Sequence, residues 1–219
     1  MSRLPPIREW KLCYVTDRKA LAGSTEQQIH LLLEIIERAA QAGVDWIQIR
    51  EKDLSTRDLT CLATEAMRLV PKSCRILVND RLDVALVSRA AGVHLGEQTL
   101  PVEEAKRLAK ERNPASQFLV GASTHSLPAA LAAEKNGADY VIFGPVFETP
   151  SKLAFGPPQG LQRLAEVCNS LSIPVVAIGG ITLENAQKCA SAGASGIAAI
   201  RLFQEAADMG AMVRALRAR

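Results

Sequence analysis

The 219-residue chain alternates short apolar runs with longer amphipathic ones, and this alternation limits its fold more than any other feature. Eight short runs have the length and the β-branched or aromatic residues that are typical of strands. They are Leu12–Thr16, Trp46–Arg50, Arg75–Val78, Val93–Leu95, Phe118–Gly121, Tyr140–Phe143, Pro174–Ile178 and Gly196–Ile200. Segments with helical periodicity lie between them, most clearly Thr25–Gln41, Val102–Arg112, Leu127–Asn136 and Leu183–Ala192. Strands that alternate with helices indicate a parallel sheet, in which each helix connects one strand to the next.

The ends of the helices support this interpretation. Ser24 and Gln27 form a capping-box pattern before the first long helix, and Gly43 follows its end. The same join, from a helix through glycine into a strand, occurs in AAQAGVDWIQI, AEKNGADYVIF and ASAGASGIAAI. Eight such units without a linker predict a single-domain (β/α)8 TIM barrel over residues 1–219. An open doubly wound sheet is the alternative, but no GxGxxG motif follows the first strand.

Composition excludes several classes of protein. The 26 basic and 23 acidic residues give a net charge of +3 and are interspersed, so nothing favours nucleic acid or a membrane as partner. No apolar run approaches the roughly 20 residues of a membrane span, and the N-terminus lacks the apolar core of a signal peptide. The five cysteines include no CxxC pair, which argues against a disulfide framework or a zinc site. We expect a cytoplasmic protein with reduced thiols.

Polar residues gather where the predicted strands end, which is the end that carries the chemistry in a (β/α)8 barrel. In the second strand, Gln48, Arg50 and Lys52 share one face because strand side chains alternate. An amide and two cations in one row face either solvent or an anion. Lys152 follows the sixth strand and adds another cation, which is either a ligand for an anion or a solvated residue of the rim.

Two glycines, Gly179 and Gly180, end the seventh strand just before a helix. The loops after strands seven and eight commonly bind phosphate in this fold, and glycine lets backbone N–H groups approach the anion. A tight turn between strand and helix is the alternative reading of the pair. Arg201 follows the eighth strand at the same end of the barrel.

An acid and a histidine also follow predicted strands. Asp80 follows the third strand and Asn79, so it is either a Mg²⁺ ligand or the N-cap of the next helix. His125 lies in Ser-Thr-His-Ser after the fifth strand and is either a general acid/base or a capping or packing residue. We expect His94, within the fourth strand, to be structural.

The stretches that carry these residues resemble the thiamine phosphate synthase/TenI family. They are YVTD (14–17), QIREK (48–52), NDRLDVAL (79–86), GVHLGE (92–97), GASTHS (121–126), GADYVIFGPVFETPSK (137–152) and PVVAIGGI (174–181). They cover nearly the whole chain, and the combination of QxRxK, GPVFxTxxK and AIGGI is specific. The family is a (β/α)8 barrel, in agreement with the count of strands.

The resemblance implies an enzyme of thiamine biosynthesis that joins a hydroxymethylpyrimidine pyrophosphate to a thiazole phosphate and releases pyrophosphate. It implies that the pyrimidine pyrophosphate is held by Gln48, Arg50, Lys52, Asn79, Ser123 and Lys152. It implies a thiazole phosphate site formed by Thr149, Ser151, Gly180 and Ile200. We add Gly179 and Arg201 to this site because they follow the seventh and eighth strands. Asp80 would bind Mg²⁺ as the cofactor. The sequence leaves open whether the chain forms a homo-oligomer.

Two positions depart from the synthase pattern. The family usually has Gln-Glu-Asp after GVHLG, with the Asp as a second Mg²⁺ ligand, whereas this chain has Glu97-Gln98-Thr99. Arg201 stands where a serine is common. These differences support two alternatives: a TenI-like thiazole tautomerase with His125 as acid/base and no need for Mg²⁺, or a non-catalytic paralogue that binds phosphate ligands.

Overall fold

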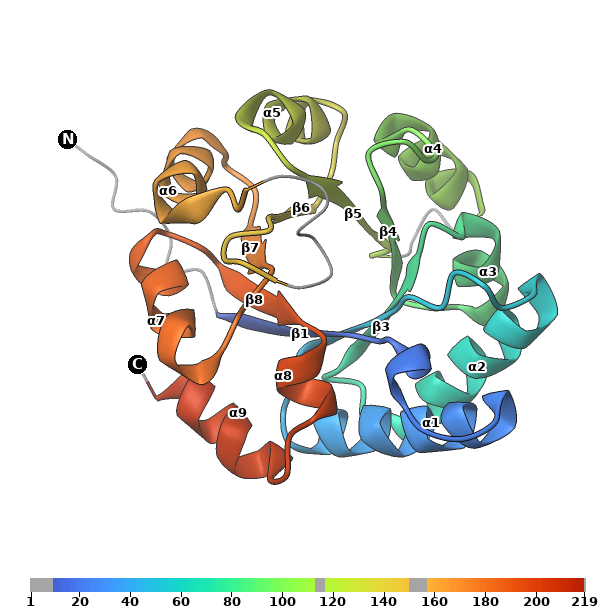
Figure 1. Cartoon of the computed structure of the whole chain (residues 1–219). Coiled ribbons are helices and arrows are strands. Elements are labelled where there is room, and N and C mark those ends of the chain that lie inside the picture. Colours follow the sequence, from blue (N-terminus) through green and yellow to red (C-terminus); the bar gives the residue numbers. More distant parts are fainter. Residues whose placement is uncertain (1–9, 113–116, 150–156, 219) are drawn as a thin grey trace.

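The computed structural model describes residues 10–112, 117–149 and 157–218, and within them the strands form a closed parallel barrel (Figure 1). Each strand pairs with the next along the chain, and β8 closes the ring by pairing with β1. The strands are β1 (Lys11–Val15), β2 (Trp46–Ile49), β3 (Arg75–Asn79), β4 (Gly92–Leu95), β5 (Leu119–Thr124), β6 (Tyr140–Phe143), β7 (Val175–Ile178) and β8 (Gly196–Ala199). The predicted (β/α)8 barrel is therefore confirmed, whereas the domain limits of 1–219 stay a prediction.

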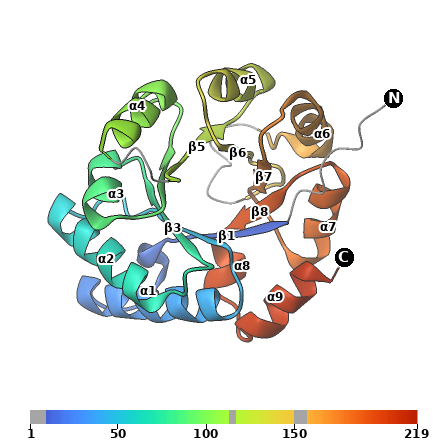
Figure 2. The same ribbon diagram turned by 180° about the vertical axis from the view of Figure 1, so that it is seen from behind.

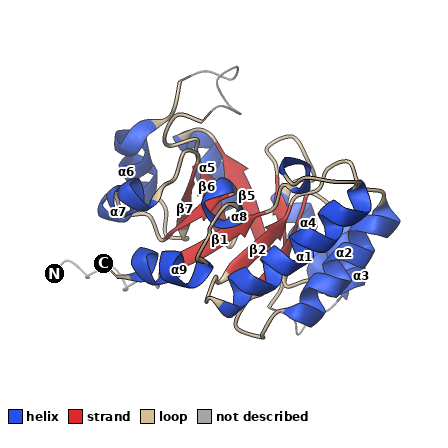
Figure 3. Cartoon of the chain, turned by 60° about the horizontal axis from the view of Figure 1, so that its bottom comes forward, coloured by secondary structure: helices blue, strands red, loops and turns tan. Residues whose placement is uncertain are grey.

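The helices form a ring around the barrel, which Figures 1 and 2 show from its two sides. They are α1 (Thr25–Gln41), α2 (Thr56–Leu69), α3 (Leu82–Ser88), α4 (Val102–Arg112), α5 (Leu127–Lys135), α6 (Gly160–Ser170), α7 (Leu183–Ser191), α8 (Arg201–Gln204) and α9 (Met209–Arg217), with a 3-10 turn, η1 (Arg18–Ala20). Figure 3 shows the strands inside and the helices outside. No described helix is long and apolar enough to cross a membrane.

The helix ends follow local rules that the sequence already contains. Ser24 and Gln27 form the predicted capping box of α1, with each side chain bonded to the backbone N–H of the other residue. Gly43 follows this helix with a φ of 98°, a backbone conformation that favours glycine. Ser126 accepts a hydrogen bond from the Ala129 N–H at the start of α5.

Two hydrophobic layers stabilise the fold. The larger layer lies between the barrel and the helices, where Leu32 and Ile36 of α1 are fully buried. The smaller layer fills the inside of the barrel and consists of Cys13, Val15, Trp46, Leu77, Tyr140, Ile142, Val176 and Ala198. Gly121 makes room for Tyr140 there, since a Cβ atom at Gly121 would lie 2.1 Å from the Tyr140 ring. The interior is thus a packed core, and ligands have access only at its ends.

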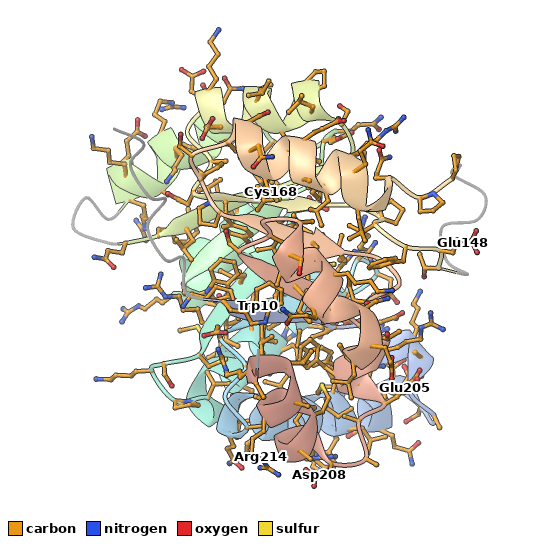
Figure 4. The ribbon with its side chains drawn as sticks, turned by 90° about the vertical axis from the view of Figure 1, so that its left-hand side faces the viewer. Trp10, Glu148, Cys168, Glu205, Asp208 and Arg214 are labelled. Carbon is orange, nitrogen blue, oxygen red and sulfur yellow. The ribbon has the colours of Figure 1, made fainter. Side chains whose placement is uncertain are left out.

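Most predicted boundaries are correct to within one residue, and α1 and α4 match exactly the ranges expected for them. The largest error is in β5, which continues through Ser123 to Thr124, whereas the predicted strand ended at Gly121. The C-terminal α9 packs beside α1 and α7. Figure 4 shows Asp208 and Arg214 on the outer side of α9, whereas Trp10 lies inside the molecule.

Candidate functional site

The carboxyl ends of β2, β3 and β5 bring three predicted ligands to one end of the barrel. Gln48, Asn79 and Ser123 lie two residues beyond the interior residues Trp46, Leu77 and Gly121 on these strands and share their face, so they point to the barrel axis above the packed core. Gln48 is only 3% exposed, while Asn79 and Ser123 are partly exposed. Polar side chains therefore cover the core at this end.

The side chains of Gln48, Asn79 and Asp80 form a hydrogen-bond chain with a fixed direction. Gln48 Nε2 donates to Asn79 Oδ1 over 2.8 Å, and Asn79 Nδ2 donates to Asp80 Oδ2 over 2.7 Å. An ionised carboxylate only accepts hydrogen bonds, so Asn79 must present its NH₂ group to Asp80 and its carbonyl to Gln48. This leaves the carbonyl oxygen of Gln48 at the far end of the chain.

That carbonyl oxygen, Gln48 Oε1, is buried and has no hydrogen-bond partner among the described residues. Leaving a buried acceptor unpaired costs about 1–3 kcal/mol. A ligand or an ordered water is the usual partner of such a group. The missing partner must be a hydrogen-bond donor.

Neighbouring groups hold the Asp80 carboxylate, and it does not cap the next helix. Its Oδ1 accepts the Gly96 N–H over 2.8 Å, and its backbone has a φ of 59°, which is uncommon for a residue other than glycine. The residue before α3 is Arg81, with no side-chain capping bond, so the capping role considered for Asp80 is wrong. Each carboxylate oxygen of Asp80 keeps a second lone pair for a metal ion.

No described acid joins Asp80 in a metal site. Glu97 Oε1 accepts the backbone N–H of His125 over 2.9 Å, and the Thr99 hydroxyl donates to the Gly96 carbonyl over 2.9 Å. Among the described residues no group of three His, Cys, Asp or Glu side chains could hold a metal. A single carboxylate still fits Mg²⁺ that arrives with a pyrophosphate, because this ion is usually held by one or two carboxylates together with phosphate oxygens and waters.

The cations Arg50 and Lys52 follow β2 on a loop that a buried network holds in place. The Thr16 hydroxyl donates to Glu51 Oε1 over 2.6 Å and accepts the Arg50 N–H over 2.9 Å. Glu51 also accepts the Arg18 N–H over 3.1 Å. Thr16, Arg18 and Glu51 are each at most 4% exposed, so the network ties the end of β1 to the loop after β2.

The network also balances its own charge. Burial raises the pKa of the Glu51 carboxyl, although its hydrogen bonds from Thr16 and Arg18 oppose this shift. Arg18 forms an ion pair with Asp53 over 2.7 Å, and its side-chain hydrogen bond lowers the pKa of Asp53. The side chains of Arg50 and Lys52, in contrast, have no ion pair or hydrogen bond within the described part of the chain. They are available to an anion.

A cavity of about 230 Å³ opens beside these residues at the outer edge of the β2 and β3 ends. It is lined by Glu51, Lys52, Leu54, Leu59, Asn79, Asp80 and Arg81. Lys52 and Asp80 thus contribute to the same hollow, so a cation and the candidate metal ligand face one space.

His125 lies just beyond β5 and is exposed. Its Nδ1 is 2.5 Å from the Gly144 carbonyl oxygen, and because a carbonyl only accepts, Nδ1 carries the proton. In the neutral ring Nε2 therefore keeps its lone pair. Ser126, not His125, caps α5, so the ring is free of the capping role that was the alternative.

His94 lies inside the barrel, as expected for a structural residue, but it also contacts a predicted ligand. Its Nδ1 is 3.1 Å from the Tyr140 hydroxyl and its Nε2 is 2.9 Å from the Ser123 hydroxyl. Burial lowers its pKa to about 4, with a smaller effect of the positive charge of Arg50 and an opposing effect of Asp80. The ring is therefore neutral at pH 7.

The glycines after β7 come close to the loop after β6. A Cβ atom at Gly180 would lie 2.4 Å from the Glu148 carbonyl oxygen, and one at Gly179 would lie 2.5 Å from the Pro145 side chain. The φ value is 97° at Gly179 and 62° at Gly180, so both positions require glycine on conformational as well as steric grounds. The α7 helix begins three residues after Gly180, at Leu183, with Thr182 and Asn185 as its capping box.

The other predicted ligands on this side come from neighbouring loops. Ile200 follows β8, and Arg201 is the exposed first residue of α8. Thr149 is partly buried on the loop after β6. Lys152 and Ser151 lie outside the described residues. Figure 4 shows Glu148, from the same loop as Thr149, at the edge of the molecule.

Sequence reasoning missed the residues that support the ligands from behind. Thr16 was noticed only at the end of a strand and Tyr140 only as part of one, and Arg18 was not singled out. The one sequence signal that could have identified them is a polar residue at or just beyond the end of an apolar strand. Their partners are 33 to 46 positions away in the sequence, so only the fold identifies them.

Comparisons with known proteins agree with the fold and with the family that the sequence resembles. A sequence model of the family described as thiamine monophosphate synthase matches residues 12–203. A thiamine-phosphate synthase of Methanoculleus marisnigri is 41% identical over 211 residues, which cover 96% of this chain and 95% of that protein. One of Chloroflexus aurantiacus is 40% identical, with 97% and 93% covered. The structure of a thiamine phosphate pyrophosphorylase from Pyrococcus furiosus superposes with a TM-score of 0.80 at 35% identity, covering 96% of this chain and 95% of that one.

Proposed function

Since the chain belongs to the thiamine monophosphate synthase/TenI family, we propose that it is a thiamine-phosphate synthase. This enzyme is a transferase that couples a hydroxymethylpyrimidine pyrophosphate to a thiazole phosphate and releases pyrophosphate. Its substrates are thus two small phosphorylated molecules. Relatives with this name that match nearly the full length of the chain at about 40% identity support the assignment.

The buried, unpaired carbonyl of Gln48 is the observation that carries the proposal. The hydrogen-bond chain from Asp80 through Asn79 leaves this oxygen as an acceptor at the end of the barrel. A pyrimidine ring with an N–H group would present the donor that this oxygen lacks. Binding of the pyrimidine would therefore remove a cost of about 1–3 kcal/mol that the free protein bears.

The cations provide for the pyrophosphate. Arg50 and Lys52 lie on the loop after β2, next to Gln48, without a protein partner for either side chain in the described residues. Guanidinium and ammonium groups bind phosphate oxygens strongly and stabilise the charge of a leaving anion. Lys152 and Ser123 complete this half of the site in the proposal. Asp80 would hold Mg²⁺, which when bound would neutralise part of the pyrophosphate charge.

The glycines after β7 provide for the second substrate. Gly179 and Gly180 expose their backbone just before α7, where N–H groups and the helix dipole favour an anion. The phosphate of the thiazole would bind there, lined by Thr149, Ser151 and Ile200. Arg201 lies at the adjoining end of β8 and would add a charge to the same phosphate.

This placement suits a substitution at carbon. The bond between the pyrimidine methylene carbon and the pyrophosphate oxygen breaks, and the electron pair leaves with the pyrophosphate. The thiazole nitrogen then donates its lone pair to the resulting carbocation. Arg50 and Lys52 hold the leaving anion while Gln48 orients the ring, so the protein acts by positioning and by charge.

A thiazole tautomerase is the second candidate, because of the geometry of His125. Its Nδ1 proton is bound to the Gly144 carbonyl, which leaves Nε2 to move a proton. The same reaction needs no Mg²⁺, in accord with Thr99 where the family has a second acid. Arg50 and Lys52, whose side chains have no partner in the described part of the chain, favour the synthase, since a tautomerase has no pyrophosphate to bind.

Product analysis separates the two functions. The protein is incubated with the pyrimidine pyrophosphate, the thiazole phosphate and Mg²⁺, and separately with the thiazole carboxylate phosphate. We expect thiamine phosphate in the first mixture and a loss of at least about 100-fold in rate for Arg50→Gln, since it removes a charge on the leaving group. Arg214→Gln, on the outer side of α9, is the matched control and should be unchanged. Isomerised thiazole without thiamine phosphate would contradict the synthase.

A further inference from the structure

A hydrogen-bond chain crosses the inside of the barrel from β6 through β4 to β5. The Tyr140 hydroxyl is 3.1 Å from His94 Nδ1, and His94 Nε2 is 2.9 Å from Ser123 Oγ. Tyr140 and His94 are each 1% exposed, whereas Ser123 is partly exposed at the end of the barrel. The chain therefore connects the packed core to the ligand side of Ser123.

Packing holds the two rings of this chain in one arrangement. The rings of His94 and Tyr140 stack with their centroids 5.6 Å apart. The Tyr140 ring also packs against the Trp46 ring, with a centroid distance of 4.6 Å. Gly121 leaves the space that the Tyr140 ring occupies, since a Cβ there would lie 2.1 to 2.4 Å from that ring. Side chains packed in this way do not change rotamer easily, so the two hydrogen bonds stay aligned.

The buried phenol fixes the direction of the chain. A neutral imidazole has one N–H and one lone pair, so two directions are conceivable. The Tyr140 proton has no acceptor among the described residues other than His94 Nδ1. If Nδ1 carried the histidine proton, the Tyr140 oxygen would accept it and the phenol proton would be left in the core without an acceptor among the described residues. Tyr140 therefore donates to Nδ1, and His94 donates from Nε2 to Ser123 Oγ.

The Ser123 hydroxyl can consequently act toward a ligand only as a hydrogen-bond donor. Its oxygen accepts from His94, so its own O–H points to another acceptor, and no described residue supplies one. We propose that Tyr140 and His94 are positioning residues that make the Ser123 hydroxyl a dedicated hydrogen-bond donor toward a phosphate oxygen of the ligand. The part of this inference that concerns the phosphate rests on the proposed function, whereas the direction of the chain does not.

The tautomer of His94 is the first test and needs no ligand. In the full chain labelled with ¹⁵N-histidine, long-range ¹H–¹⁵N NMR spectra distinguish the protonated ring nitrogen from the unprotonated one, and a His94→Gln sample assigns the signal. We expect the proton on Nε2 at pH 7. A proton on Nδ1 would overturn the proposal, whatever the protein catalyses. Tyr140→Phe removes only the phenol oxygen, and we expect it to reduce the population with a proton on Nε2.

Binding of inorganic pyrophosphate with Mg²⁺, measured by calorimetry, is the second test. Ser123→Ala should weaken binding about 10-fold, the effect of one hydrogen bond to a charged group. If His94 acts through Ser123, then His94→Leu weakens binding in the native background but has no further effect in Ser123→Ala. Equal effects of His94→Leu in both backgrounds would show a merely structural role and contradict the proposal.

A conservative variant and a control complete the design. Gln at position 94 has an NH₂ group for Ser123 and a carbonyl for the Tyr140 proton, so His94→Gln should bind pyrophosphate more tightly than His94→Leu. His30→Gln, on the exposed side of α1, should bind like the native protein. If His94→Leu does not fold, Tyr140→Phe replaces it in the cycle, with the same expectation. A native protein that binds no pyrophosphate would contradict the proposed function, and the tautomer of His94 would still decide the direction of the chain.

Discussion

The stability of the protein should fall in mildly acidic solution because of one buried histidine. His94 has a pKa of about 4 in the folded protein, against an ordinary value of 6.5, since burial disfavours its charged form. The unfolded chain takes up a proton at this residue below about pH 6.5, whereas the folded protein does so only near pH 4. Between these values protons favour the unfolded state, so stability is lost as the pH falls.

The size of the effect follows from the difference between the two pKa values. A separation of about 2.5 pH units, at about 1.4 kcal/mol for each unit, gives an upper value of about 3.5 kcal/mol. This is a large part of the 5–15 kcal/mol that is typical of a folded domain. His94 is fully buried, so solvent does not screen the effect.

Denaturant unfolding without Mg²⁺ at several pH values between 7 and 4 measures it. The native protein is compared with His94→Gln, so that the contributions of His30, His125 and the carboxyl groups cancel. We expect the difference in the free energy of unfolding to change by about 1.4 kcal/mol per pH unit below pH 6.5, to the disadvantage of the native protein. A difference that is constant with pH would refute the reasoning, because it would mean that His94 has an ordinary pKa.

Three further predictions concern the loops at the end of the barrel. Glu51→Gln should lower the free energy of unfolding by about 2 kcal/mol and weaken pyrophosphate binding, because it removes a charged acceptor from the network under Arg50. Glu205→Gln on the surface is the control for this variant. Gly180→Ala should cost about 1–2 kcal/mol through its φ of 62° alone and should raise the KM for the thiazole phosphate; an unchanged KM would place that phosphate elsewhere. Thr99→Asp, but not Thr99→Asn, should lower the Mg²⁺ concentration needed for half-maximal coupling, because it restores a second carboxylate near Asp80, and equal behaviour of the two variants would exclude that explanation.

The sequence predicted the barrel well because its local signals agree with its tertiary structure. Glycine and capping residues mark the ends of α1, and period-2 alternation in β2 already put Gln48 and Arg50 on one face. β5 was predicted too short because Ser123 is polar, and a polar residue inside a strand is read as a loop. In the structure the polar end of β5 contacts other polar groups at the end of the barrel, so tertiary contacts determine where this strand ends.

The candidate site was predicted in its list of residues but not in its connections. Asp80 was singled out from the sequence and stays a predicted ligand, yet only the fold shows that Gly96 and Asn79 hold its carboxylate and that it caps no helix. Glu97 lies near the position of the missing acid in the sequence, and only the structure shows that it accepts the backbone N–H of His125. His94 was expected to be structural and is buried, but its contact with Ser123 joins strands 29 residues apart and leaves no trace in either local sequence.

The central claim, that this end of the barrel couples two phosphorylated substrates, is tested most directly by following the reaction itself. ³¹P NMR of the purified protein with the pyrimidine pyrophosphate, the thiazole phosphate and Mg²⁺ shows substrates and products at once. The account predicts that pyrophosphate and thiamine phosphate appear in equal amounts, and that neither appears with Arg50→Gln on the same time scale. Unchanged substrates with the native protein, or pyrophosphate released without thiamine phosphate, would contradict it.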